Sequence, residues 1–174
     1  YQFEAAYDHF TNIEGRLETQ LAQAQAGMDL QSGDEWRVEV KNSYEYLDEP
    51  FEISDGVVLP VGGYRFNEVE ARYTVGPQRR VNGWFWAGGG QFYDGTRTEV
   101  GYRGRIEITS RIGVEPGITI NWIHLAEGSF VAKLVTARVT CNLSPRKTVI
   151  GLVQYNSAGG VVGATPELLF ALEA

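Results

Sequence analysis

The chain has 174 residues, 43% hydrophobic and 21% charged, so it is long enough for one folded domain and too apolar for intrinsic disorder. A net charge of -7 supplies no basic field for phosphates, which argues against nucleic acid as a partner. The single cysteine, Cys141, excludes an internal disulfide and a multi-cysteine metal site. Because the chain starts at Tyr1 without Met or an apolar signal segment, we expect it to be an excised part of a longer protein.

Period-2 runs bounded by turn-forming residues predict about ten strands. They span residues 2–10, 15–30, 35–47, 63–75, 80–93, 96–110, 114–124, 129–143, 147–156 and 160–172. Most separators are short, and Asp94-Gly95 is a strong hairpin signal, so an up-and-down antiparallel meander is expected. The connection from Asp48 to Gly62 is longer and contains two prolines, which predicts a loop at one rim.

Residues 14–30 are the one helix candidate, since Ala, Gln, Leu and Glu favour helices. However, Leu17, Thr19 and Leu21 alternate with polar residues, and a second alternating run begins at Ala22 after a one-residue slip. Two such runs are typical of a strand that contains a bulge, and this interpretation is favoured over the helix.

Two long segments separate apolar from charged side chains. Between Trp36 and Tyr46, one face has Trp36, Val38, Val40, Tyr44 and Tyr46. Between Arg97 and Ile108, one face has Val100, Tyr102, Ile106 and Ile108. These segments exceed the roughly 5–6 residues of an ordinary soluble strand and suit the roughly 9–11 of a tilted membrane-crossing strand.

Alternation alone does not decide whether the apolar face meets a protein core or lipid. Small residues on the apolar faces, such as Ala24 and Gly89, together with rings near strand ends, such as Tyr44 and Trp122, favour lipid. We therefore predict an all-β fold: an antiparallel up-and-down β-barrel, either complete or part of a larger barrel. Residues 1–174 then form one barrel domain or a C-terminal barrel fragment.

The polar sides of these strands supply the candidate lumen-lining residues, in which both charge signs are mixed. They are Arg37, Glu39, Lys41, Glu68, Glu70, Arg72, Arg97, Glu99, Arg103, Arg105, Glu107 and Arg138. Pairing across neighbouring strands would give a ladder of ion pairs that fills a narrow lumen. This face is either a polar pore or binding lumen, or a solvated, paired surface with no ligand.

The residues that carry chemistry elsewhere form no constellation here. His9 and His124 have no second ligand at metal spacing, and we predict neither a metal site nor a cofactor. Glu68 and Glu70 share a face, but a carboxylate pair is common in an acidic chain, so no catalytic residue is assigned. Cys141 lies on an apolar face and is expected to be inert. We expect the protein not to be an enzyme.

Three segments, "LDEPFEI…GVVLPVGGYRF", "FYDGTRT" and "LSPR…GLVQYNS", resemble an uncharacterised bacterial family. The similar part is its C-terminal outer-membrane-like β-barrel region, which follows a carbohydrate-binding module of the family-nine type. The resemblance runs from about residue 14 to residue 157 and implies a Gram-negative outer-membrane location with a transport or polysaccharide-related role. The module is absent here, so its sugar binding does not carry over.

The end of the chain departs from that family, and residues 165–174 form an atypical tail. Pro166 would interrupt the ladder of a central strand, which places the tenth strand in question. The functional prediction is an outer-membrane pore, transporter or surface anchor in contact with lipid, with a saccharide or small solute as cargo. The alternative is a soluble periplasmic or extracellular barrel that binds a small apolar or saccharide ligand inside.

Overall fold

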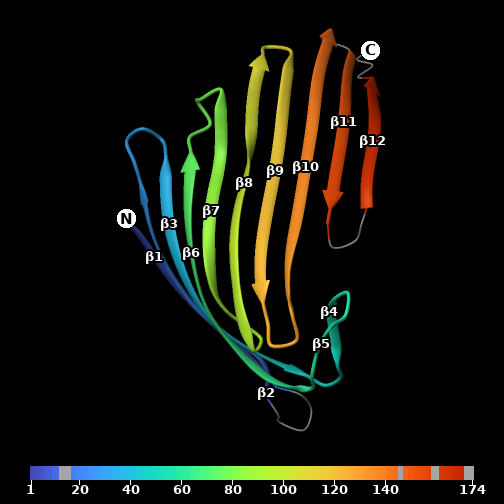
Figure 1. Cartoon of the computed structure of the whole chain (residues 1–174). Coiled ribbons are helices and arrows are strands. Elements are labelled where there is room, and N and C mark those ends of the chain that lie inside the picture. The colour runs from blue at the N-terminus through green and yellow to red at the C-terminus, as the bar shows by residue number, and fades with distance from the viewer. Residues whose placement is uncertain (12–16, 145–146, 158–160, 171–174) are drawn as a thin grey trace.

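The computed structural model describes residues 1–11, 17–144, 147–157 and 161–170, and these ranges contain strands and turns but no helix (Figure 1). The strands are β1 Gln2–Thr11, β2 Leu17–Asp29, β3 Glu35–Leu47, β4 Phe51–Ser54, β5 Val57–Leu59, β6 Gly62–Val75, β7 Val81–Phe92, β8 Gly95–Thr109, β9 Ile112–His124, β10 Ser129–Ser144, β11 Lys147–Asn156 and β12 Val161–Phe170. Among the described residues, no helix is long and apolar enough to cross a membrane.

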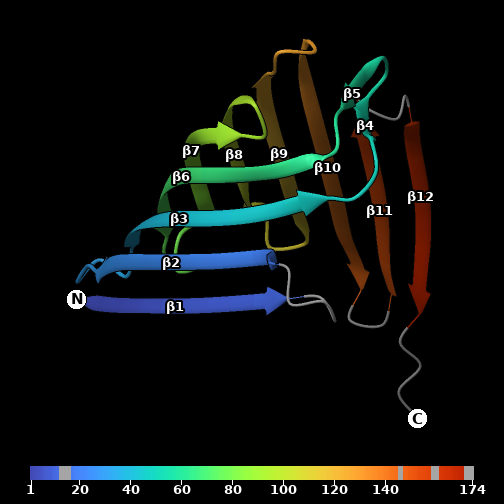
Figure 2. The ribbon, with the colours of Figure 1, turned by 90° about the horizontal axis from the view of Figure 1, so that it is seen from below.

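Ten strands form one antiparallel sheet in the order β1-β2-β3-β6-β7-β8-β9-β10-β11-β12. Strands that follow one another in the chain pair throughout, except that β3 pairs with β6 because β4 and β5 form a separate sheet, and this confirms the predicted all-β, up-and-down architecture. The sheet is strongly bent, so that β1–β3 run across the view in Figure 2 while β10–β12 run up and down. The edge strands β1 and β12 each pair with one neighbour, and the described residues do not close the expected barrel.

The segment predicted as a strand with a bulge forms β2, and the helix alternative is wrong. Its pairing with β3 is uninterrupted from Thr19 opposite Glu45 to Asp29 opposite Glu35, so the bulge expected near residue 21 is absent. A register shift occurs instead opposite Phe10 and Thr11 of β1. Because both neighbours fix the alternation of β2 at this point, Leu21 lies on the same face as Gln23 and Gln25. Residues 15 and 16 lie outside the described ranges.

The tenth strand, placed in question by Pro166, is present as β12. It pairs with β11 over ten positions, with Pro166 opposite Gly151. β12 is an edge strand, where the missing N–H of proline is tolerated, and this explains why the ladder continues. Residues 171–174 of the tail lie outside the described ranges.

The long connection contains a second, two-stranded sheet, β4 and β5, and the prediction of a plain loop is wrong. The strands meet at Asp55-Gly56, where Gly56 adopts a φ of 74° that suits glycine in a tight turn. Leu59 is fully buried, and with Val57 it packs against Ile123 and Leu125. This cluster attaches the β4–β5 hairpin to the ends of β9 and β10, which are distant from β3 and β6 in the sheet.

At the opposite end of the sheet, Asp34 joins two turns. Its carboxylate accepts hydrogen bonds from the Gly76 amide at 2.9 Å, the Tyr73 hydroxyl at 2.9 Å and the Arg79 guanidinium at 2.8 Å. The Ser32 hydroxyl donates a fourth at 3.0 Å. These bonds, led by the one from Gly76, hold the pKa of Asp34 at about 2, and the residue as a whole is 4% exposed. The β2–β3 and β6–β7 turns are therefore fixed to each other.

Truncating Leu59 to alanine should destabilise the fold by about 2–5 kcal/mol, because a buried leucine loses its transfer energy and leaves a cavity. The matched control is Val58→Ala, since Val58 is the neighbouring residue and is 45% exposed. Chemical denaturation of the folded chain measures both variants. Equal effects of the two substitutions would show that the hairpin does not pack as described.

Replacing Asp34 by asparagine should lower the free energy of unfolding at neutral pH, because a charged acceptor of four hydrogen bonds is lost. The pKa of Asp34 is lowered from 3.8 to about 2, so its contribution is present above pH 4 and disappears as the pH falls through 2. Denaturation from pH 7 to pH 2 should show the wild type and Asp34→Asn converging. The exposed Asp55→Asn serves as the control, and parallel curves for Asp34→Asn and wild type would contradict the assignment.

Candidate functional site: the charged face of the sheet

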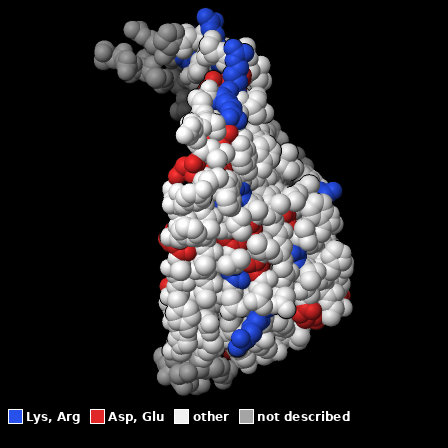
Figure 3. All heavy atoms as spheres, turned by 90° about the vertical axis from the view of Figure 1, so that its left-hand side faces the viewer, with Lys and Arg blue, Asp and Glu red and all other residues white. Residues whose placement is uncertain are grey.

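All twelve residues predicted to line a lumen lie on one face of the large sheet, here named the charged face. The register places Arg37 opposite Arg72, Glu39 opposite Glu70, and Lys41 opposite Glu68. The alternation continues through β7 to β8 and β9 and reaches Arg138 of β10, opposite Glu115. Figure 3 shows acidic and basic side chains intermixed along the middle of the molecule. The structure thus confirms that the twelve residues share one face, and their lining of a lumen stays a prediction.

Most of the ion pairs form within strands, so the expected cross-strand ladder is largely wrong. Lys41 contacts Glu39 at 3.2 Å, and Arg72 contacts Glu70 at 2.9 Å. The reason lies in the register, because Glu39 faces Glu70 and like charges directly opposite each other cannot pair. Neutralisation then comes from the residue two positions along the same strand, on the same face.

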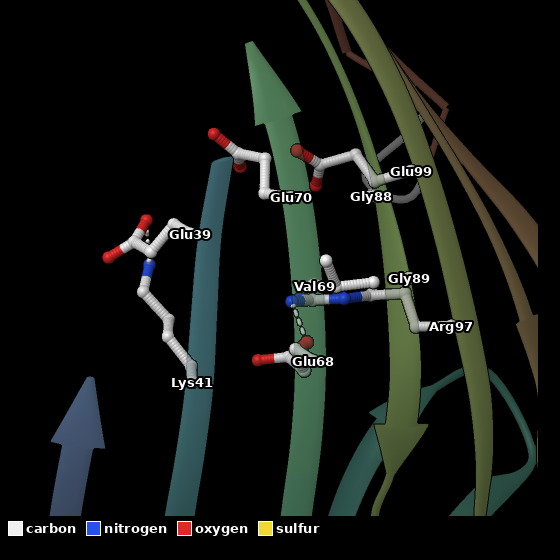
Figure 4. A pocket seen from close by; sticks show the side chains of 9 residues that line it. All are labelled: Glu39, Lys41, Glu68, Val69, Glu70, Gly88, Gly89, Arg97 and Glu99. Carbon is white, nitrogen blue, oxygen red and sulfur yellow. Dashed lines mark hydrogen bonds and ion pairs between the residues drawn. The ribbon is translucent and has the colours of Figure 1, made fainter. Parts of the chain in front are cut away.

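One ion pair reaches across an intervening strand, and a glycine makes it possible. Gly90 of β7 lies between Glu68 of β6 and Arg97 of β8 in the register. With no side chain at Gly90, the Arg97 guanidinium reaches over β7 to the Glu68 carboxylate at 2.5 Å (Figure 4). The glycines of β7 therefore make room for charged side chains on both neighbouring strands. The sequence analysis placed these glycines in a strand without predicting this role.

Two tryptophans, Trp84 and Trp86, also belong to the charged face, and the sequence analysis did not assign them to it. The Trp86 indole N–H donates to the Glu99 carboxylate at 2.5 Å. Its ring covers Gly101, where an added Cβ would overlap the indole. The sequence signal for this placement was the alternation of Trp84 and Trp86 with Phe85. Because large apolar residues lie on both faces of β7 here, the pattern does not show which face is the polar one.

Rings gather where the charged face meets the β4–β5 hairpin. Tyr93 contacts Tyr64 and Phe66 edge-on, each with ring centroids 5.1 Å apart, and Phe92 at 4.8 Å. Tyr93 lies in the β7–β8 turn with a φ of 53°, uncommon for an aromatic residue, and these contacts hold it there. Burial, with a smaller contribution from Glu45, raises the pKa of Tyr93 to about 12. The predicted hairpin is confirmed, with Tyr93-Asp94 as its two-residue loop.

The other residues considered for chemistry lie apart. His9 is exposed on β1 beside Tyr7, and His124 is exposed at the end of β9. No group of three His, Cys, Asp or Glu side chains in the described part of the chain could hold a metal ion. Cys141 is a free, partly exposed cysteine. What the charged face offers is a surface of charges, hydroxyls and indoles for noncovalent binding.

No protein-family model matches the chain, and neither does any curated protein or solved structure. The resemblance to the outer-membrane-like barrel region therefore remains a prediction from the quoted segments.

Adding a methyl group at Gly101 should displace the Trp86 indole and break its hydrogen bond to Glu99. We expect Gly101→Ala to weaken the near-ultraviolet circular dichroism of the chain and shift its tryptophan emission. Gly151→Ala is the matched control, because a Cβ at Gly151 of β11 meets no atom within 4 Å. An unchanged spectrum for Gly101→Ala would show that Trp86 does not lie on Gly101.

Proposed function

We propose that the chain is a segment of an outer-membrane-type β-barrel that acts as a pore, transporter or surface anchor, with its apolar face toward lipid and its charged face toward a polar lumen. A Gram-negative outer membrane is the location that this architecture suits. The observation that carries the proposal is the uncovered apolar face of the large sheet.

The apolar face extends over the large sheet opposite the charged face. Val40 is 51% exposed, Val69 50% and Phe85 48%, although all three lie in strand interiors, where a core would bury them. The β4–β5 hairpin packs against Ile123, which belongs to the charged face, and leaves the apolar face bare. A contiguous apolar surface of this kind is an aggregation hazard in water and is the normal exterior of a membrane barrel.

The apolar face has a distinct margin at each end. Toward the Asp34 end, adjacent strands place Trp36, Tyr73, Phe85 and Tyr102 in one row of rings. Toward the other end, the side-chain amide of Asn42 donates to Asn67 at 2.6 Å, and that of Asn67 to Gln91 at 2.5 Å. Rings at one border and a hydrogen-bonded amide row at the other match a lipid-facing band that ends at polar interfaces.

The band runs obliquely to the strand register. In β3 the last apolar residue toward the Asp34 end is Trp36 of the ring row. In β8, Ile106 and Ile108 lie beyond Tyr102 of the same row, so the band extends further along that strand. Such a drift is what tilted strands produce, because a band parallel to the membrane then crosses each strand at a shifted position.

The alternative of a soluble barrel with an apolar interior has less support. It needs the apolar side chains to pack against one another around a ligand, whereas Val81 and Ile108 are 51% and 58% exposed. It also leaves the charged face to water, although the one buried hydrophobic cluster of the described residues packs on that side. No observation on the apolar face favours this second function.

Two neighbouring residues of β2 give a matched test of orientation. Ala26 lies on the apolar face between Phe3 and Val38, and Gln25 lies on the charged face between Glu4 and Glu39. In vesicles, Ala26→Arg should cost about 2–4 kcal/mol, because the arginine enters the lipid, whereas Gln25→Arg gains two carboxylate neighbours. Urea denaturation of the chain refolded into phospholipid vesicles measures both.

The same test includes partitioning between vesicles and buffer. We expect the wild-type chain to require detergent or lipid. A chain that stays soluble and monomeric without either would overturn the proposal, as would equal tolerance of Ala26→Arg and Gln25→Arg in the bilayer.

A further inference from the structure

A hollow of about 430 Å³ lies on the charged face over β7–β11, a size within the range of small-molecule sites. Trp84, Arg103, Thr136, Arg138 and Leu152 line it. An adjoining hollow of about 330 Å³ shares Trp84, Arg103 and Thr136 with it and continues toward Trp86. The larger hollow shares no lining residue with the acidic region around Glu68 and Glu70 that Figure 4 shows, whereas the adjoining hollow reaches Glu70 and Glu99 of that region.

The larger hollow is positively charged. Arg103, Arg105 and Arg138 line it, with Glu115 as its one carboxylate. Arg105 contacts Glu107 at 3.4 Å and Glu115 at 3.9 Å. By contrast, Arg103 and Arg138 make no ion pair with any side chain that the structure describes. Two guanidinium groups with free donors on the walls of one hollow favour an anion, and a carboxylate can accept two parallel hydrogen bonds from either.

The floor of the hollow is apolar and bare. Trp84 stands directly opposite Arg103 across β7 and β8. On the far side of Arg103 the opposite residue is Gly117, and the Thr136 side chain of β10 lies over this glycine. Leu152, directly opposite Arg138 on β11, adds an apolar side chain that is 41% exposed. A ligand that fits has an apolar face for the indole and an acid group for the arginines.

We propose that this hollow binds an acidic saccharide, in which the C–H face of a pyranose ring lies on the Trp84 indole and the carboxylate meets Arg103 and Arg138. The Thr136 hydroxyl, on the same wall, donates to the Gly117 carbonyl at 3.5 Å, and its oxygen can accept a hydrogen bond from a ring hydroxyl. An inorganic anion can pair with the arginines but makes no contact with the indole ring of Trp84. A neutral sugar can lie on the indole ring but has no charge to pair with the arginines. That the saccharide is the ligand of a membrane lumen rests on the proposed function. Its binding to the charged face can be measured whether or not the chain is part of a membrane barrel.

The test uses the full chain in detergent micelles, titrated with D-glucuronate and followed by tryptophan fluorescence and calorimetry. Saturable binding is expected, with D-glucose and inorganic phosphate each at least tenfold weaker. Arg103→Gln and Arg138→Gln should each weaken glucuronate binding about tenfold or more, as expected for a lost charged hydrogen-bond donor. Arg65→Gln is the matched control, since Arg65 is exposed on the opposite face and should leave affinity unchanged.

A second variant separates the two halves of the site. Trp84→Leu should weaken glucuronate while leaving the weaker phosphate binding unchanged, and near-ultraviolet circular dichroism of each variant confirms that it is folded. Equal affinity for glucose would overturn the role of the arginines, and equal affinity for phosphate that of the indole. If folded wild type shows no saturable binding yet partitions into vesicles, this inference fails and the proposed function stands.

Discussion

The continuous antiparallel register of ten strands is the constraint on which the rest of the molecule depends. Side chains alternate with a period of two along each strand. If one strand slipped by one residue against its neighbour, the charged side chains of that strand would move to the apolar face. The pairing of β3 with β6 runs without interruption from Glu35–Thr74 to Leu47–Gly62. Because the neighbouring ladders keep the same phase, a charge on β3 and one on β10 share a face.

The strand register determines which ion pairs can form on the charged face and which cannot. Like charges fall opposite each other between β3 and β6, and in-strand partners neutralise them. Glycines on β7 then let Arg97 reach Glu68 across a strand. The acids thereby concentrate over β3 and β6, while Arg103 and Arg138 are left unpaired over β8 and β10 among the described residues. This division gives the face two regions of opposite character.

The periodic pattern predicted ten strands whose ends lie within two residues of those that the structure describes, and it placed all twelve charged residues on one face. Three features escaped it. The β4–β5 hairpin is short and flanked by prolines, so Asp55-Gly56 was not recognised as a turn between strands. The bulge expected in β2 is absent because both neighbours hold its phase. Trp84 and Trp86 were missed because large apolar residues occupy both faces of β7.

Local alternation and turn chemistry in the sequence determine the strands, their antiparallel order and the separation of charge from apolar surface. These are short-range properties, since each strand shows its own period and each turn its own Gly, Asp or Pro. Only the tertiary structure decides which charges pair, because register and the missing side chain of Gly90 lie between residues far apart in the chain. The tertiary structure also decides that the hairpin packs over the charged face and leaves the apolar face uncovered, since that depends on contacts between Leu59 and Ile123.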